Sequence, residues 1–121
     1  MALTTLAAGA APAAAATLSG PSRLHVLQQV TYRATGLPAG SYALLIERTS
    51  SRGARCTAHL AARRQASGVE LFHGSLPDGL QCVRGSQQFS TGVRPGAYRV
   101  LVRAVAGNGR AVAGRSVRVV G

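Results

Sequence analysis

The two cysteines, Cys56 and Cys82, are the residues of this sequence best suited to covalent chemistry. They form an even set in a chain whose first residues resemble an export signal, so we predict that they form a disulfide. Closing a loop of about 27 residues would stabilise the folded state by roughly 3 to 4 kcal/mol. We expect the two Cα atoms to lie about 4.4 to 6.8 Å apart, where the bridge would staple two loop-proximal segments.

Two free thiols, or a metal site shared with histidine, are the alternatives for these cysteines. A structural metal site needs about four ligands that cluster in space. The possible ligands Cys56, His59, His73 and Cys82 follow no recognised ligand spacing. We therefore predict no metal site.

Groups that could catalyse a reaction are sparse in this chain. The acidic residues are Glu47, Glu70 and Asp78, and the histidines are His25, His59 and His73. The spacing of Glu70 and Asp78 does not identify a pair of glycosidase carboxylates. Each histidine falls in or near a predicted strand, where a structural or exposed histidine is commoner than a general base. Since no nucleophile elbow, phosphate loop or zinc motif occurs, we predict a protein without enzymatic activity or cofactor.

All 14 basic residues are arginines, and they give the chain a formal net charge of +11. The guanidinium group keeps its charge and its planar fork suits phosphate, sulfate or carboxylate, so one interpretation is affinity for an anionic polymer. The other is a compositional bias toward Ala, Gly and Arg, because net charge speaks to non-specific binding rather than to a target. The predicted strands place Arg99, Arg103 and Arg118 on an outward face, with Glu47 nearby, as a candidate anion-binding surface.

A second hypothesis concerns Arg84 in the sequence Cys82-Val83-Arg84-Gly85. A loop anchored by a disulfide is pre-organised, which lowers the cost of binding a protease. Arg84 is therefore a candidate inhibitory residue for trypsin-like proteases, and an ordinary connection is the alternative.

The elements that must position these residues are strands. Residues 92–121 are predicted to form a hairpin in which Tyr98, Val100 and Val102 share one face. The segment Gly107-Asn108-Gly109 supplies residues that tolerate positive φ in a tight turn. Gly114 is predicted to form a β-bulge in the return strand.

Earlier segments continue the pattern of alternating apolar residues. Further strands are expected at 17–19, 24–35, 41–49, 55–63, 69–76 and 87–91, with 55–63 at a sheet edge. The segment GLPAGSYALLIE resembles GVRPGAYRVLVR at an offset of 56 residues, which indicates two strands that enter the same kind of sheet through the same kind of turn. The expected fold class is all-β.

The start of the chain differs from the rest in composition. Residues 1–16, MALTTLAAGAAPAAAA, resemble the apolar and cleavage regions of a secretory signal that lacks its charged start. A membrane span is not expected, because the apolar run is shorter than about 20 residues and contains Pro12. We predict one domain at 17–121, in a secreted or cell-surface protein.

The segment FSTGVRPGAYRVLVRAV, residues 89–105, is similar to strands E and F of fibronectin type III and related bacterial immunoglobulin-like domains. The resemblance implies a β-sandwich of seven to eight strands, in which the tyrosine matching Tyr98 packs at a corner and bonds back to the main chain. The core Trp of the family is absent here. The resemblance implies a non-catalytic module that binds or spaces, with an anionic polymer or a protein as its partner and with the oligomeric state left open.

Overall fold

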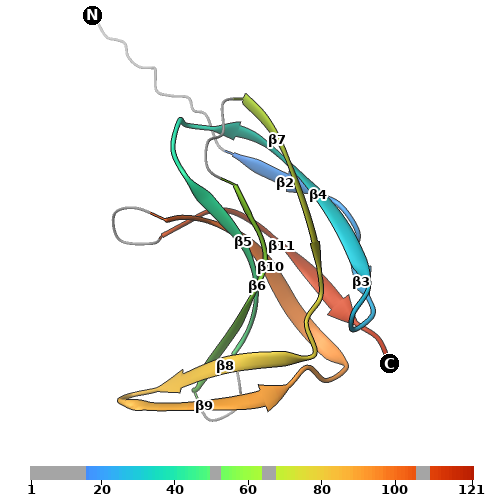
Figure 1. Ribbon diagram of the computed structural model, residues 1–121, viewed down its shortest axis with the longest axis vertical. Helices are drawn as coiled ribbons and strands as arrows, with labels where there is room; N and C mark the ends of the chain where they lie inside the picture. Colours follow the sequence, from blue (N-terminus) through green and yellow to red (C-terminus); the bar gives the residue numbers. More distant parts are fainter. Residues whose placement is uncertain (1–15, 50–52, 64–67, 106–109) are drawn as a thin grey trace, which may run out of the picture.

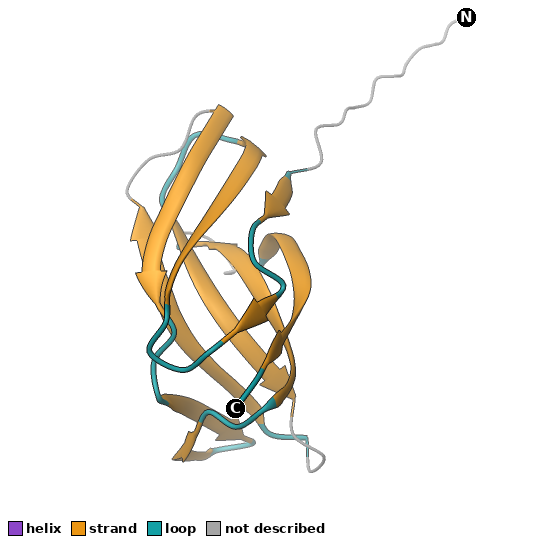
Figure 2. Ribbon diagram, turned by 90° about the vertical axis from the view of Figure 1, so that its right-hand side faces the viewer, coloured by secondary structure: helices purple, strands orange, loops and turns teal. Residues whose placement is uncertain are grey.

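In the computed structural model the described residues are 16–49, 53–63, 68–105 and 110–121, and they form strands connected by turns, with no helix (Figure 2). This confirms the predicted all-β class. The strands are β2 (Thr17–Ser19), β3 (Arg23–Leu24), β4 (Gln29–Leu37), β5 (Tyr42–Thr49), β6 (Arg55–Arg63), β7 (Gly68–Ser75), β8 (Gly79–Arg84), β9 (Gln87–Gly92), β10 (Gly96–Ala104) and β11 (Ala111–Val119).

Two sheets enclose the core. The larger sheet has seven strands in the order β3-β11-β10-β5-β6-β8-β9, and the smaller has three in the order β2-β4-β7. Figure 1 shows the smaller sheet curving over the larger one, while the β8–β9 hairpin lies at the end of the molecule away from the N-terminus. Strands β11, β10 and β5 are consecutive neighbours in the larger sheet, and β10 and β11 form the hairpin predicted for residues 92–121.

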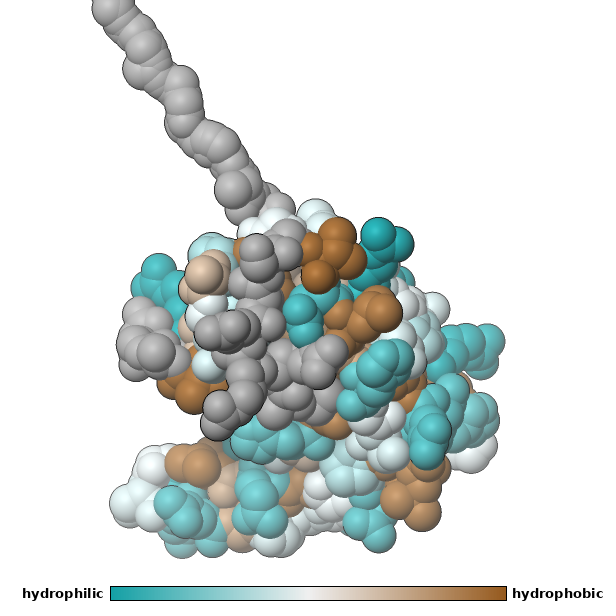
Figure 3. Space-filling model, turned by 45° about the horizontal axis from the view of Figure 1, so that its top comes forward, coloured by the Kyte–Doolittle hydropathy of each residue, from teal (hydrophilic) through white to brown (hydrophobic). Residues whose placement is uncertain are grey.

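The core lies between the inner faces of the sheets because apolar side chains alternate along most strands. In β10, Tyr98, Val100 and Val102 are all buried, which confirms their predicted inward face. The largest fully buried side chains come from both sheets and include Tyr32, Phe72, Leu24, Leu44 and Ile46. Burial of each aliphatic or phenyl side chain stabilises the fold by about 1.5 to 3 kcal/mol. On the face drawn in Figure 3, exposed hydrophobic residues form small separate groups among hydrophilic and neutral ones.

The predicted single strand 24–35 is wrong, because a turn divides it. Leu27 has a φ of 67°, and its amide donates to the carbonyl of Leu76 at 2.7 Å. This turn sends β3 to the larger sheet and β4 to the smaller one. The side-chain oxygen of Gln28 accepts a hydrogen bond from the backbone amide of His25 at 2.7 Å, which gives this half-buried polar side chain a partner within the turn.

The bulge predicted at Gly114 is also misplaced. Gly114 pairs regularly with Leu101, and the register shifts instead between Val102 and Arg103, which pair with Ala113 and Ala111. Gly114 has a packing role, because a Cβ there would lie 2.7 Å from Leu101 Cδ2 and 3.1 Å from Arg99 Nη2. The predicted turn at Gly107 to Gly109 lies outside the described residues.

Strand β6 is not simply an edge strand, and β8 was not predicted. β6 lies between β5 and β8, although it pairs with β8 only at Arg55, Cys56 and Thr57. The ten described strands exceed the seven to eight expected, because β3 separates from β4 and because β8 forms a hairpin with β9. Residues 1–15 of the signal-like segment lie outside the described part of the chain. No helix in the described part is long and apolar enough to cross a membrane.

Candidate anion-binding face

The outer face of the seven-stranded sheet brings together the three arginines selected from the sequence. Arg99 and Arg103 alternate with buried Val100 and Val102 along β10, so their side chains leave the sheet on the side away from the core. Arg118 of β11 lies opposite Ala97 of β10, and Ala97 is on the same outer face as Arg99 and Arg103. Arg99 and Arg118 are exposed, and Arg103 is half-buried.

Sequence reasoning missed two further arginines on this face. Arg23 pairs with Arg118 in the parallel β3–β11 ladder. The next pair in this ladder, Leu24 and Val119, is buried, so Arg23 and Arg118 lie on the outer face of the sheet. Arg55 of β6 is exposed and contacts Glu47 on β5. We name these five residues the arginine face: Arg23, Arg55, Arg99, Arg103 and Arg118.

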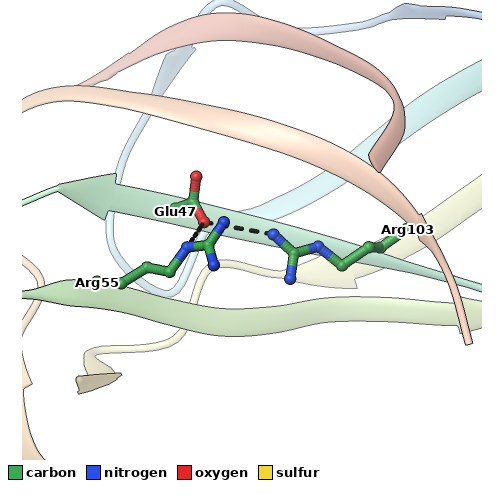
Figure 4. Close-up of polar contacts among 3 residues, drawn as sticks. All are labelled: Glu47, Arg55 and Arg103. Atoms are coloured by element: carbon green, nitrogen blue, oxygen red, sulfur yellow. Dashed lines mark hydrogen bonds and ion pairs between the residues drawn. The ribbon is translucent and has the colours of Figure 1, made fainter. Parts of the chain in front are cut away.

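Glu47 organises one end of the arginine face (Figure 4). Its Oε2 accepts from Arg55 Nε at 2.9 Å and from Arg103 Nη2 at 3.4 Å, and its residue lies directly opposite Arg99 in the β5–β10 ladder. The side chain of Glu47 is 14% exposed, against 26% for Arg103 and 62% for Arg55. The partly buried carboxylate therefore fixes the Arg103 guanidinium more firmly than an exposed ion pair would.

Beneath the arginine side chains, the outer face of the sheet carries two buried leucines. Leu45 and Leu101 pair across β5 and β10 on this outer face, yet they are only 9% and 6% exposed. Arg99, Arg103 and Arg110 line the same open depression as Leu101. Long arginine stems cover apolar groups while the charged heads stay in water.

The face is elongated. Arg118 lies opposite Ala97, and Ala97 precedes Arg103 by six residues along β10. At about 3.3 Å per residue, Arg103 and Arg118 are therefore separated by roughly 20 Å along the strand direction. Arg23 continues the row by one strand. This arrangement suits a linear chain of anionic groups better than a single small anion.

Tyr98 holds the turn that leads into β10. Its hydroxyl donates to the carbonyl of Arg94 at 2.8 Å and accepts from the Arg94 amide at 3.1 Å. The main-chain bond implied by the family resemblance is therefore present. On the inner side, the guanidinium of Arg48 lies 5.7 Å from the centre of the Tyr98 ring, within the range of a cation–π contact.

Cys56 and Cys82 form a disulfide, as predicted, and both are buried. Their Cα atoms are 4.0 Å apart, which is shorter than the predicted interval. The reason is that the two residues face each other in the β6–β8 ladder, where the closer type of antiparallel pair has Cα atoms about 4.5 Å apart. The bridge thus joins adjacent strands rather than two loop-proximal segments.

The stretch that the disulfide encloses is largely strand. It contains β7 and most of β6, and buries Leu60, Phe72 and Leu76. The bridge therefore reinforces an ordered part of the sheet.

Arg84 does not lie in an extended loop. It is the last residue of β8 and pairs with Gln87 across the turn formed by Gly85 and Ser86. Its guanidinium lies 5.7 Å from the centre of the Phe89 ring and donates to Gln87 Oε1 at 3.3 Å. The inhibitor hypothesis placed Arg84 on a loop anchored by the disulfide, whereas Arg84 ends strand β8 and its side chain folds over the β8–β9 hairpin.

The remaining titratable residues are dispersed over the described structure. His59 is exposed on β6, and His73 lies on the outside of the smaller sheet with Nδ1 2.9 Å from Thr31 Oγ1. Both cysteines are committed to the disulfide, and no group of three or more possible metal-ligating side chains occurs within the described ranges. The outer face of the larger sheet therefore offers fixed positive charge from its arginines.

Comparisons with known proteins found no match. No protein-family model matches the chain, and neither a similar curated protein nor a similar solved structure was found.

Proposed function

We propose that this chain is a non-catalytic, immunoglobulin-like module, secreted or held at the cell surface, that binds an anionic polymer through the arginine face. The ligand class is a linear polymer of sulfate, phosphate or carboxylate groups. Arg99, Arg103 and Arg118 are the central contacts, and Arg23 and Arg55 extend the site at its two sides.

The pairing of Arg23 with Arg118 is the observation that carries this proposal. Two exposed arginines lie side by side on neighbouring strands, and within the described structure neither forms an ion pair. Like charges in this arrangement are unfavourable for the sheet. Among the described residues on the outer face of the larger sheet, Glu47 is the one carboxylate, and it already forms ion pairs with Arg55 and Arg103. A bound anion would relieve the repulsion and complete the charge balance.

The strand order supports the immunoglobulin-like part of the proposal. Strands β2, β4 and β7 correspond in sequence order to the A, B and E strands of such a domain, and β5, β10 and β11 correspond to C, F and G. The β8–β9 hairpin is an addition between E and F. The disulfide also differs, because it joins β6 to β8 rather than linking the B and F strands.

The disulfide supports export, because such bridges persist mainly in oxidising compartments. Residues 1–16 are then a leader with small residues before the cleavage position, and 17–121 form the mature domain. Mass spectrometry of the natively produced protein tests this step. A mature N-terminus near Thr17 and no alkylatable thiol are expected, whereas an intact Met1 with two free thiols would contradict export.

Retention on a heparin column tests the binding proposal, because heparin is a linear sulfated polysaccharide. We expect the folded protein to elute above about 0.15 M salt, since several charge contacts must be broken together. Elution below that concentration would leave only weak general attraction and would contradict a dedicated site.

A further inference from the structure

Strand β9 is an open edge of the larger sheet. Among the described strands it is the last in the order, and its one partner there is β8. Of its residues Gln87 to Gly92, all are exposed except the half-buried Thr91. Figure 1 shows the β8–β9 hairpin lying across one end of the molecule, with its tip extending to one side of β5 and β6.

The turn decides which main-chain groups face this edge. Gly85 has a φ of 60°, and Arg84 and Gln87 pair directly across the two-residue connection. Because pairs that exchange hydrogen bonds alternate along an antiparallel ladder, the groups of Gln87, Phe89 and Thr91 are directed toward β8. The amides and carbonyls of Gln88 and Ser90 are therefore directed toward the open side, where they can accept a further strand.

Edges of this kind are usually protected by charged residues, proline, bulges or a very short strand. The sequence of β9, QQFSTG, has neither a charged residue nor proline, and its pairing with β8 is regular. The other edge of the same sheet, β3, is protected by its length of two residues. β9 is thus a six-residue edge, and no other described strand pairs with the outward main-chain groups of Gln88 and Ser90.

Positive charge is fixed beside this edge. Arg84 reaches across from β8, stacks on the Phe89 ring and bonds to Gln87, so its guanidinium lies above β9. Arg94 is exposed two residues after the end of β9. The nearest carboxylate in sequence, Asp78, precedes β8 at the base of the hairpin, whereas Arg84 lies at its tip.

We propose that β9 binds an extended, carboxylate-bearing peptide segment as an additional strand. Main-chain bonds to Gln88 and Ser90 would supply affinity, and alternate side chains of the peptide would face Phe89 and Arg84. Charge complementarity selects this occupant over a second copy of the chain, because a copy carries the same net charge of +11 and the same arginine beside the edge.

A synthetic peptide of alternating Val and Glu is the probe, and the same peptide with Lys in place of Glu is its control. Titration calorimetry with the full chain should detect the acidic peptide only. In the native chain the amides of Gln88 and Ser90 should gain protection from hydrogen exchange on binding. Equal binding of both peptides, or protection elsewhere than β9, would overturn the proposal.

Two variants at one position separate main-chain recognition from side-chain effects. Gln88→Pro removes an amide that faces away from β8 and should weaken binding at least about tenfold, whereas Gln88→Ala keeps the amide and should stay within about twofold. Arg84→Gln should weaken the acidic peptide severalfold. If Gln88→Pro disturbs the hairpin, the exchange pattern of the native chain still decides the question.

The arginine face supplies the last control. A variant with Arg23, Arg99 and Arg118 all changed to Gln should retain peptide binding, so failure here is distinguishable from failure of polymer binding. Loss of peptide affinity in that variant would place the peptide on the arginine face. Sedimentation that shows stable dimers held by β9 would identify a second copy as the occupant and also overturn the proposal.

Discussion

The hydroxyls of Tyr42 and Tyr98 make the same main-chain hydrogen bond at opposite ends of one pair of strands. Tyr42 donates to the carbonyl of Pro38 at 2.7 Å, and Tyr98 donates to that of Arg94 at 2.8 Å, in each case four residues upstream. Strands β5 and β10 run antiparallel, with Leu45 opposite Leu101. The offset of 56 residues that relates the two segments therefore describes a local twofold arrangement in the sheet, centred on this leucine pair.

We predict that the two tyrosine bonds differ in energetic weight. Tyr42→Phe should lower the free energy of unfolding by about 0.5 to 1.5 kcal/mol, the usual value of one hydrogen bond. Tyr98→Phe should cost about 1 to 3 kcal/mol, because its hydroxyl also accepts from the Arg94 amide. Urea denaturation of the two variants measures both values. A larger loss for Tyr42→Phe would contradict this ranking.

Loss of the disulfide should release the β8–β9 hairpin first. The β6–β8 ladder has only three residue pairs, with Cys56 and Cys82 at its centre. Replacing both cysteines with Ala should cost roughly 3 to 4 kcal/mol and lower the melting midpoint by about 10 to 20 °C.

Hydrogen exchange of this double variant localises the effect. Amides of β8 and β9 should lose protection, while those of β10 and β11 keep it longest. Uniform loss of protection over the whole sheet would show that the bridge stabilises the fold globally instead.

Stability should fall between about pH 10 and 12 because of Tyr32. Burial raises the pKa of Tyr32 to about 12, although the nearby charge of Arg115 opposes the shift. An unfolded tyrosine ionises near pH 10, so the folded state keeps its proton over a range in which the unfolded chain releases it. The stabilisation is complete below pH 10, and about 1 to 3 kcal/mol is lost as pH rises through the folded-state pKa.

Tyr32→Phe isolates this contribution. The variant should show a shallower decrease in unfolding free energy over the same pH range, although it loses the 2.6 Å bond from the hydroxyl to the carbonyl of Pro21 at all lower pH values. Identical slopes for the native chain and the variant would exclude Tyr32 as the source.

Removing the carboxylate of Glu47 should strengthen polyanion binding. Glu47→Gln leaves the arginine face without a carboxylate, so elution from heparin should move to higher salt. Glu70→Gln makes the same charge change on β7 of the other sheet and is the matched control. An equal shift for both variants would indicate a response to net charge alone.

Periodicity was sufficient to predict the outward placement of Arg99, Arg103 and Arg118, because it depends only on alternation along a strand. Arg23 could not be placed in this way, since its position depends on a parallel pairing with Arg118 across most of the chain. The positive φ of Leu27 is a second case, because leucine gives no local signal for such a turn.

Glycine was ambiguous for a different reason. Gly114 in a strand is compatible with either a bulge or a close approach, and only the neighbouring Leu101 and Arg99 decide between them. Arg84 was assigned to a loop because β8 contains few large apolar residues and its pairing with β6 depends on the disulfide. Contacts distant in sequence thus determined what local patterns could not.

The most direct test of the arginine face compares two variants of equal net charge. One changes Arg23, Arg99 and Arg118 to Gln, and the other changes three exposed arginines elsewhere, Arg33, Arg84 and Arg94. Affinity for a heparin oligosaccharide is measured over a series of salt concentrations. The first variant should bind more than about tenfold more weakly, with a reduced salt dependence because fewer counterions are released, and the second should change much less. Equal losses in the two variants would contradict a specific site and leave net charge as the whole explanation.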